Sequence, residues 1–411
     1  MTTAGSAVEF ISRLAPSFAF RDFRLLWLST LLQSASMGMI WVVTGWLVFE
    51  ITDSAFMVGV SSALTMIPFF VLGLVSGAVA DRVERRTLLI IVTLGGVAVS
   101  LVISAVLIAD VAQLWHILVL ITIGGCVTAF QMTTRQSLTY DIVGPRLALN
   151  GLSLNSVSMQ VGSIVGSLLS GVIISAYGAG GQFLLIGATY FASVLFLLPI
   201  GARREAPVGQ RASVTRNLAD YVDIMRTNRI LVTLMALAAL TEIFGFTHMS
   251  LLPVIAKDVL GLGPIGLGVM TAVRQIGGIA GLLTLSSMGN FRRKGLLMFG
   301  LMALFGASLM ALMISTNLIH YVAMLTLATG CAMAVDTLYM TLMQENVPDE
   351  QRGRAMGAWT LSIGVAPAGH LGLGGLAGAV GAPLALFASG SVLVVGSLIT
   401  AVTLPSIRRL E

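Results

Sequence analysis

Three charged side chains lie deep inside long apolar stretches of this chain: Glu242, Arg274 and Asp336. Each costs roughly 2.5–3.5 kcal/mol at the centre of a membrane helix, so each needs a partner or a hydrated cavity. Arg274 can neutralise only one of the two acids. Because burial disfavours the charged form of a carboxyl group, the other acid can bind and release a proton. We therefore expect Glu242 or Asp336 to carry protons and Arg274 to pair with the other; the alternative is a structural triad.

Uncharged polar side chains in other apolar stretches are candidates for the lining of a central cavity: Gln33, Ser36, Gln131, Asn155, Gln160 and His248. A single histidine is more often a hydrogen-bonded packing residue than a ligand. The two cysteines, Cys126 and Cys331, have neither metal-ligand spacing nor a disulfide framework. We therefore expect no metal and no cofactor.

A third group of charges is the ten-residue stretch GAVADRVERR, which runs from Gly77 to Arg86 between two apolar stretches. Its charged side chains are Asp81, Arg82, Glu84, Arg85 and Arg86. Cations beside a membrane span set its orientation, but an aspartate adds little to that effect. We therefore expect a further function for Asp81 and Arg85, whereas Arg82 and Arg86 need only set the orientation of the neighbouring spans in the membrane.

The elements that position these groups are membrane helices. Of the 411 residues, 56% are hydrophobic and only 10% are charged, and the mean hydropathy is +0.96. Soluble domains carry roughly 25% charged residues, so a soluble protein of this composition could not cover its surface. The apolar stretches are continuous and about twenty residues long, which is the length that a helix needs to cross about 30 Å of hydrocarbon. The strands of membrane β-barrels instead alternate apolar and polar residues. We read no removable signal peptide at the start of the chain.

A pass along the chain predicts twelve spans. They cover residues 23–49, 55–80, 87–108, 114–138, 151–176, 182–201, 230–256, 265–289, 294–315, 317–345, 357–380 and 383–404. Nearly all of the 23 Lys and Arg flank one set of alternate loops, and only Lys257 lies in the other set. We expect the protein in the inner (plasma) membrane. Since cytoplasmic loops attract Lys and Arg, we expect both termini and the central loop on the cytoplasmic side of that membrane. The excess of cations follows from this asymmetry, so we expect contact with the lipid bilayer and no nucleic-acid partner.

The twelve spans divide into two halves with weak internal similarity. ITIGGCVTAFQ (121–131) resembles LATGCAMAVD (327–336), and RRTLL (85–89) resembles RRKGLL (292–297), in both cases about half a chain apart. Parallel six-helix repeats of this kind occur in transporters that work by alternating access. We therefore predict an N-terminal bundle (1–201), a cytoplasmic linker (202–229) and a C-terminal bundle (230–411), with no enzyme site.

Several of these stretches resemble the major facilitator superfamily. GAVADRVERR is similar to its loop 2–3 signature, Gly-x-x-x-Asp-Arg-x-x-Arg-Arg, and VPDEQRGRAMG (347–357) to its loop 10–11 signature. FRDFRLLWL, ITDSAFMVG and SLNSVSMQVGSIVGSLLSG are similar to its exporter branch, which includes enterobactin exporters and macrolide efflux pumps. The resemblance covers the whole chain and implies an all-α fold of two pseudo-symmetric six-helix bundles.

The same resemblance implies that the loop after the second span is a conformational latch. Asp81 would face the start of span 11 near residue 357, where a helix N-terminus favours a carboxylate. Arg85 would pair with an acid near the end of span 4, for which Asp141 is the candidate, and Arg135 can either snorkel to the interface or join this cluster. The second half has no acid at the place of Asp81, so the latch is predicted to be one-sided.

Span 5 approximates the antiporter pattern Gly-x-x-x-Gly-Pro-x-x-Gly-Gly in GSIVGSLLSG, which runs from Gly162 to Gly171. Ser167 replaces the proline, and Ser170 replaces the first of the two final glycines. The small face would let span 5 approach a helix of the other half; ordinary small-residue packing is the equal alternative.

These observations together predict a secondary transporter and not an enzyme. It would exchange protons for a lipophilic or amphipathic small molecule, such as a drug, a secondary metabolite or a siderophore, with the outward direction implied by the resemblance. No nucleotide-binding phosphate loop, metalloprotease motif or nucleophile elbow is present. The alternatives are an importer of a small nutrient, disfavoured by the absence of a mid-span charge in the first half, and a sensor without transport. We expect a monomer.

Overall fold

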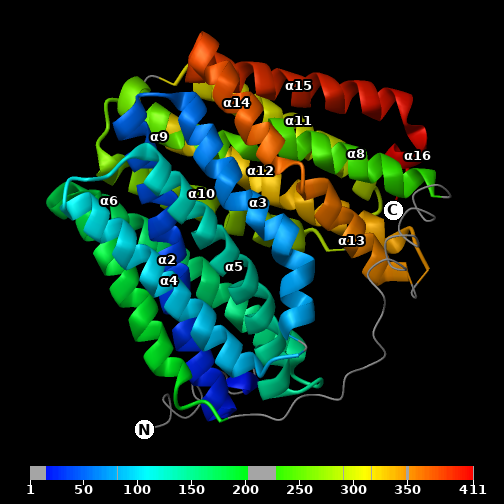
Figure 1. Cartoon of the computed structure of the whole chain (residues 1–411). Helices are drawn as coiled ribbons and strands as arrows, with labels where there is room; N and C mark the ends of the chain where they lie inside the picture. The colour runs from blue at the N-terminus through cyan, green and yellow to red at the C-terminus, as the bar shows by residue number, and fades with distance from the viewer. Residues whose placement is uncertain are drawn as a thin grey trace, which may run out of the picture. The chain divides into compact units, whose positions relative to one another are not determined.

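The computed structural model describes residues 15–80, 82–201, 228–289, 291–315, 317–348 and 351–410. All regular structure in these residues is helical (Figure 1). The long helices are α2 (Arg21–Thr52), α3 (Ala55–Ala80), α4 (Arg85–Ile108), α5 (Leu114–Val143), α6 (Ala148–Leu197), α8 (Arg229–Phe244), α10 (Pro264–Ser287), α11 (Lys294–Met313), α12 (Leu318–Glu345), α13 (Arg352–Ile363), α14 (Ala366–Val380) and α15 (Ala382–Thr403). The short ones are η1 (Pro16–Ala19), η2 (Phe246–Leu251), α9 (Leu252–Val254), η3 (Ile255–Val259) and α16 (Pro405–Arg408).

Eleven helical segments of the described residues are long and apolar enough to cross a membrane. One of them, α6, has 50 residues and contains Gly178 in a non-helical conformation, with φ 68° and ψ −178°. An unbroken helix of that length would be roughly 75 Å long, more than twice the hydrocarbon thickness. Gly178 therefore separates two spans, as the sequence predicted for 151–176 and 182–201, and the protein is a multi-pass helical membrane protein.

Two of the predicted spans are interrupted helices. The span from Arg229 to Val259 changes from α8 into the 3₁₀ turn η2, the short helix α9 and the π-helical turn η3. The span predicted over 357–380 contains a break, because α13 ends at Ile363 and α14 begins at Ala366. Irregular backbone is tolerated at membrane depth only where protein or a water-filled cavity surrounds it. At η2 and α9 most side chains are indeed buried, whereas η3 ends in the exposed residues Asp258 and Val259.

The chain divides into two compact units: Met1–Leu47 with Leu64–Val208, and Val48–Ala63 with Gly209–Glu411. The predicted bundle boundaries at 201 and 230 border residues 202–227, which lie outside the described part of the chain. That division of the domains stays a prediction. The end of α2 and the start of α3 pack in the second unit, where Lys257 lies 3.4 Å from Asp53 and over the ring of Phe49.

Small residues allow α2 and α6 to touch backbone to backbone in the first unit. A Cβ atom added to Gly166 would collide with the carbonyl oxygen of Ala35, and one added to Gly162 would collide with that of Leu31. Ser167 donates hydrogen bonds to the carbonyls of Ser163 (2.8 Å) and Gly38 (3.4 Å). The structure thus shows the small-residue packing that was the equal alternative: this face lies against the first span of its own unit.

The second unit uses the same kind of contact in other pairs of helices. Gly281 on α10 approaches the backbone of Gly330 on α12, and Gly306 on α11 approaches Gly390 on α15. In the first unit Gly125 on α5 approaches Thr65 on α3. Since lipid tails are as apolar as leucine side chains, close van der Waals packing of this kind supplies much of the attraction between membrane helices.

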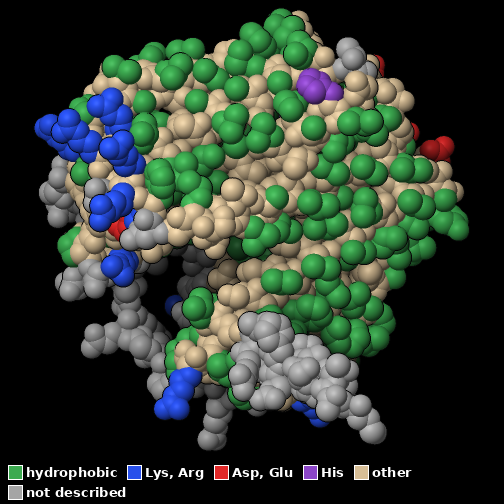
Figure 2. Space-filling view, turned by 180° about the vertical axis from the view of Figure 1, so that it is seen from behind, with side chains coloured by type: hydrophobic (Ala, Val, Ile, Leu, Met, Phe, Trp, Pro, Cys, Tyr) green, Lys and Arg blue, Asp and Glu red, His purple; other side chains and the backbone are tan. Residues whose placement is uncertain are grey.

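The surface matches a lipid environment. Hydrophobic side chains cover most of the face in Figure 2, and Lys and Arg gather toward its margins. Within the second unit Arg292 and Arg293 precede α11, whose start is joined to the C-terminal turn by a hydrogen bond from the Gly295 amide to the carbonyl of Leu410. Arg408 and Arg409 lie in or beside the same turn. Cations of this unit thus gather at one end of its helices, as the loop asymmetry of the sequence predicts.

The backbone contact between α2 and α6 generates a prediction. We expect Gly166→Ala to lower the free energy of unfolding by about 1–3 kcal/mol, because the added methyl group overpacks a contact between two backbones. The measurement is the Tm of the purified protein in detergent. Gly124→Ala is the matched control, because a Cβ at Gly124 meets nothing within 4 Å. Equal Tm values for the two variants would contradict the proposed role of the contact.

Candidate functional site

A cavity of about 300 Å³ lies inside the first unit, between α2, α3, α5 and α6. Its apolar lining consists of Met37, Trp41, Met66, Phe69, Met132 and Met159. Its polar lining consists of Gln33, Ser34, Thr65, Thr128, Gln131, Arg135, Gln160, Ser163 and Tyr190. The volume is at the lower end of the range for ligand pockets, roughly 300–1,000 Å³, and flexible methionines suit ligands of variable shape.

A buried hydrogen-bond network holds the polar side of this cavity. The amide of Gln33 donates to the hydroxyls of Ser193 (2.8 Å) and Thr93 (3.1 Å), and Gln131 donates to the same Thr93 (3.3 Å). Ser29 and Ser193 share a 2.8 Å hydrogen bond behind them. The Oε1 atom of Gln33 is buried without a partner. The network orients both glutamines toward the cavity and leaves part of their hydrogen-bonding capacity unused.

Arg135 is the cation of this cavity. Its side chain is only 7% exposed, it lies close enough to Tyr190 for an electrostatic interaction, and its Nε has no hydrogen-bond partner. Of its two predicted roles, snorkelling to the interface does not fit a residue that lines this cavity. Contact with the Asp81 cluster stays a prediction, because Asp81 lies outside the described residues. The helix α5 continues to Val143 and not to residue 138, so that Arg135 lies about two turns inside it.

The structure brings together some of the predicted cavity residues and separates others. Gln33, Gln131 and Gln160 line the cavity. Ser36 instead donates to the carbonyl of Leu32, and Asn155 donates to Thr139 at 2.6 Å; neither residue is among the lining.

His248 belongs to the second unit, in the turn η2, with its Nδ1 2.7 Å from the carbonyl oxygen of Gly245 and its Nε2 buried without a partner. It therefore lies outside the cavity of the first unit.

The buried charges of the second unit form two groups. Glu242 on α8 and Asp336 on α12 interact electrostatically, and the indole N–H of Trp359 donates to Asp336 at 2.8 Å. Arg274 on α10 lies instead within electrostatic range of His248. The predicted pairing of Arg274 with one acid is not formed: no ion pair joins them among the described residues, and the Nε of Arg274 is buried without a partner.

The charged loop after α3 is only partly described. Gly77 lies in α3, Arg82 is exposed, and Asp81 lies outside the described residues. The predicted partner of Arg85 is confirmed, because its guanidinium lies 2.5 Å from the carboxylate of Asp141 at the end of α5. Arg86 donates hydrogen bonds to the carbonyls of Leu197 and Leu198 and so closes the free end of α6.

The second unit repeats this ion pair at the corresponding place in its own sequence. Lys294 at the start of α11 lies 2.6 Å from Glu345 at the end of α12. Both Arg85 and Lys294 belong to the similar segments RRTLL and RRKGLL. Each unit therefore holds the start of one helix to the end of the next along the chain with a cation and a carboxylate.

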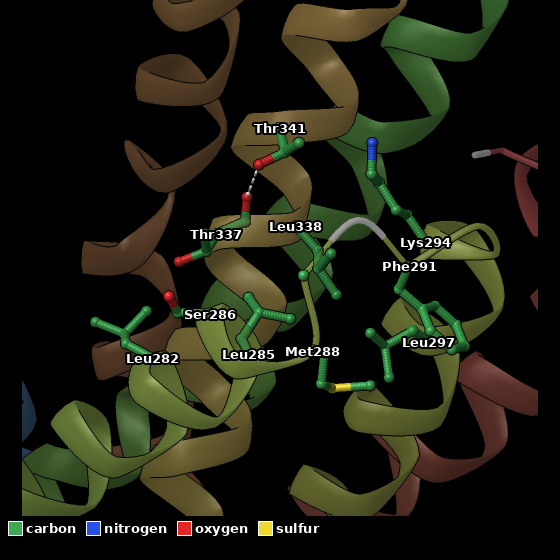
Figure 3. A pocket seen from close by; sticks show the side chains of 11 residues that line it. Leu282, Leu285, Ser286, Met288, Phe291, Lys294, Leu297, Thr337, Leu338 and Thr341 are labelled. Carbon is green, nitrogen blue, oxygen red and sulfur yellow. Dashed lines mark hydrogen bonds between the residues drawn. The ribbon is translucent and has the colours of Figure 1, made fainter.

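A smaller cavity of about 250 Å³ lies beside Lys294, and Figure 3 shows the side chains that line it. Three of its polar groups are already engaged. Thr341 bonds to the carbonyl of Thr337 in the same helix, Thr337 to that of Met333, and Lys294 to Glu345 (Figure 3 shows the first). No polar side chain there is buried without a partner among the described residues, which distinguishes this cavity from the one in the first unit.

The sequence profile of one family, described as transmembrane secretion effector, matches residues 11–410. The chain belongs to that family, within the major facilitator superfamily of transporters. It is 26% identical over 398 residues to the enterobactin exporter of Citrobacter koseri, and the match covers 94% of this chain and 92% of the relative. It is 23% identical over 330 residues to the staphyloferrin A transporter of Staphylococcus aureus, covering 79% of this chain and 82% of the relative.

Solved structures show the same fold. The nucleoside transporter NupG superposes with a TM-score of 0.75 at 15% identity, over 95% of this chain and 100% of that one. A bacterial homologue of the human lysosomal transporter Spinster superposes with a TM-score of 0.74 at 15% identity, over 96% and 98%. The predicted fold class is thereby confirmed.

Two features of the transporter's site were not anticipated from its sequence. Tyr190 lies beside Arg135, and the indole N–H of Trp359 donates to Asp336. The sequence offers little signal for them, because aromatic side chains in a membrane helix are as common in packing or lipid contact. Among the described residues no group of three His, Cys, Asp or Glu is arranged to hold a metal ion.

The Arg85–Asp141 ion pair generates a second prediction. We expect Arg85→Gln and Asp141→Asn each to lower the Tm. The double variant should lower it by less than the sum of the two, because the two residues contribute a shared coupling of about 0.5–3 kcal/mol to the free energy of unfolding. The pair is only about one-fifth exposed, so solvent screens it weakly. The control is the pair Lys257–Asp53, whose aspartate is 80% exposed and whose coupling should be below about 1 kcal/mol. Additive effects at Arg85 and Asp141 would show that the two residues act separately.

Proposed function

We propose that this major facilitator transporter exports a lipophilic or amphipathic small molecule of the siderophore kind in exchange for protons. The observation that carries the proposal is the cavity of the first unit, whose lining combines methionines and aromatic rings with polar side chains and the cation of Arg135. A compound with an apolar body and polar oxygens matches both. The names of the two relatives, one an enterobactin exporter and one a staphyloferrin A transporter, support this class of cargo.

The proposed proton carrier is one of the two acids of the second unit. Asp336 has the indole N–H of Trp359 as a hydrogen-bond donor, whereas Glu242 forms no hydrogen bond or ion pair with a described residue. A carboxyl group that no donor holds in its charged form is the better candidate to take up and release a proton in the membrane. We therefore assign proton exchange to Glu242 and a positioning role to Asp336.

The proposed latch and orientation complete the mechanism. The loop that contains Asp81 and Arg85 would hold the cytoplasmic side closed and release it as the two halves rock, with both termini in the cytoplasm. The contact between Arg85, the first residue of α4, and Asp141 supports an anchor for the helix that follows this loop. The location of Arg135 weakens the argument against the importer alternative. That argument relied on the absence of a charge inside the spans of the first half, but the cavity there contains Arg135, which would suit a negatively charged nutrient.

The test of export uses cells that overproduce the transporter and a panel of fluorescent lipophilic cations, macrolides and catechol siderophores. We expect the cells to lose at least one compound, and we expect a protonophore to abolish this loss because it removes the proton gradient. We expect Asp81→Asn to abolish this loss with normal insertion and expression, because it removes the carboxylate of the latch. Asp110→Asn, at an exposed turn, is the control and should transport normally. Uptake of a panel compound in place of its loss would contradict export and favour the importer.

The assignment of Glu242 has a test of its own. We expect Glu242→Gln to abolish the pH dependence of transport, because the amide cannot titrate, and Asp336→Asn to slow transport while its pH dependence remains. The measurement is the initial transport rate in proteoliposomes across a series of pH values. Glu50→Gln, which changes an exposed acid, should leave the profile as in the wild type. If neither variant at the buried acids alters the profile, these acids do not couple transport to protons.

A further inference from the structure

The buried charge of Arg135 is not neutralised by any residue that the structure describes. The residue is only 7% exposed, its Nε is buried without a partner, and no ion pair or side-chain hydrogen bond joins it to a described residue. The residues lining the same cavity include no aspartate or glutamate. A buried cation is strongly disfavoured unless an anion or a set of acceptors pairs with it. A folded transporter that keeps this cation in a cavity therefore has a site for an anion that arrives from outside the chain.

The surroundings of Arg135 narrow the chemistry of that anion. The guanidinium group presents several N–H donors in a plane, which suits the two oxygens of a carboxylate or the adjacent oxygens of a phenolate and its neighbour. Gln33 lines the same cavity with one amide atom unpartnered. Turning the amide would exchange its oxygen and nitrogen but still leave one of them free. The cavity thus offers a cationic fork and a neutral hydrogen-bonding group.

The apolar part of the lining accepts an apolar body. Trp41, Phe69 and four methionines belong to it, and their side chains carry no charge. An inorganic anion alone would leave these side chains without contacts, whereas an aromatic or aliphatic acid would cover them and bring its oxygens to Arg135. The combination of a buried cation and apolar lining residues is selective for organic anions over neutral or cationic compounds of the same shape.

We propose that Arg135 binds an anionic oxygen group, a carboxylate or phenolate, of the transported compound inside the first unit. The apolar part of the compound lies against Trp41, Phe69 and the methionines, and Gln33 donates to or accepts from a neighbouring oxygen. This inference rests on the proposed function, because the bound compound is taken to be the transported one. Binding itself does not depend on the direction of transport or on proton coupling.

The test is direct binding to the purified full chain in detergent, with 2-naphthoate and its neutral, similarly shaped amide 2-naphthamide as probes in isothermal titration calorimetry. We expect the wild type to bind naphthoate more tightly than naphthamide. Arg135→Gln should weaken naphthoate roughly tenfold to hundredfold, the loss of a charge-assisted hydrogen bond, and leave naphthamide unchanged. Arg135→Lys should recover part of the difference, because a charge remains but the planar fork is lost.

Two controls separate a binding role from a structural one. Arg146→Gln removes the same charge from an exposed position of the same unit and should bind both probes as the wild type does. The Tm of Arg135→Gln without probe should equal or exceed that of the wild type, because the variant removes an unpaired buried charge. A lower Tm together with equal loss of both probes would assign Arg135 to structure and overturn the proposal.

Three further results would overturn it: no naphthoate binding to the wild type at millimolar concentration, equal binding of the two probes, or loss of the naphthoate preference when chloride replaces gluconate in the buffer. The last would assign Arg135 to an inorganic anion. Failure of export is distinguishable from all of these. If cells export no panel compound while naphthoate binding depends on Arg135, the export proposal fails and the anion site stands.

Discussion

Every backbone amide and carbonyl of this chain that crosses the hydrocarbon must find its hydrogen-bond partner within the protein, because lipid offers none. This constraint explains why the described structure is helical throughout, and why α6 changes direction at Gly178 without a long loop. It also explains where irregular backbone occurs. The turn η2, the short helix α9 and the first two residues of η3 are largely buried, as irregular backbone in a membrane must be.

The same lack of hydration makes the position of every charge significant. Cations at loop ends are solvated, but Arg135, Glu242, Arg274 and Asp336 are inside spans. The two units treat these groups differently. The first has one cation in a cavity of glutamines and methionines, and the second has two acids beside Trp359 and a cation beside histidines. A division of work follows from this contrast, with cargo recognition proposed in the first unit and proton exchange in the second.

The internal repeat makes that division concrete. Gln131 ends the segment ITIGGCVTAFQ, and Asp336 ends the similar segment LATGCAMAVD. At matching places in the two halves, the first unit therefore has an amide that lines the cavity, and the second has a carboxylate. The ion pairs Arg85–Asp141 and Lys294–Glu345 have kept their charges in both halves. We infer that the repeat preserved the anchoring contacts and diverged at the positions that contact cargo or protons.

The sequence by itself determined the membrane location, the twelve spans and the superfamily, because composition, span length and the loop signature are local properties of the chain. It also predicted the partner of Arg85, since both residues flank spans that are neighbours in the fold. Tertiary structure alone decided that α6 packs its small face on α2, that Arg135 lies in a cavity and that Arg274 leaves both acids unpaired. These outcomes depend on how far each helix extends and on its rotation about its own axis. A few residues of helix length place Arg135 in a cavity and not at the interface, and hydropathy does not resolve that difference.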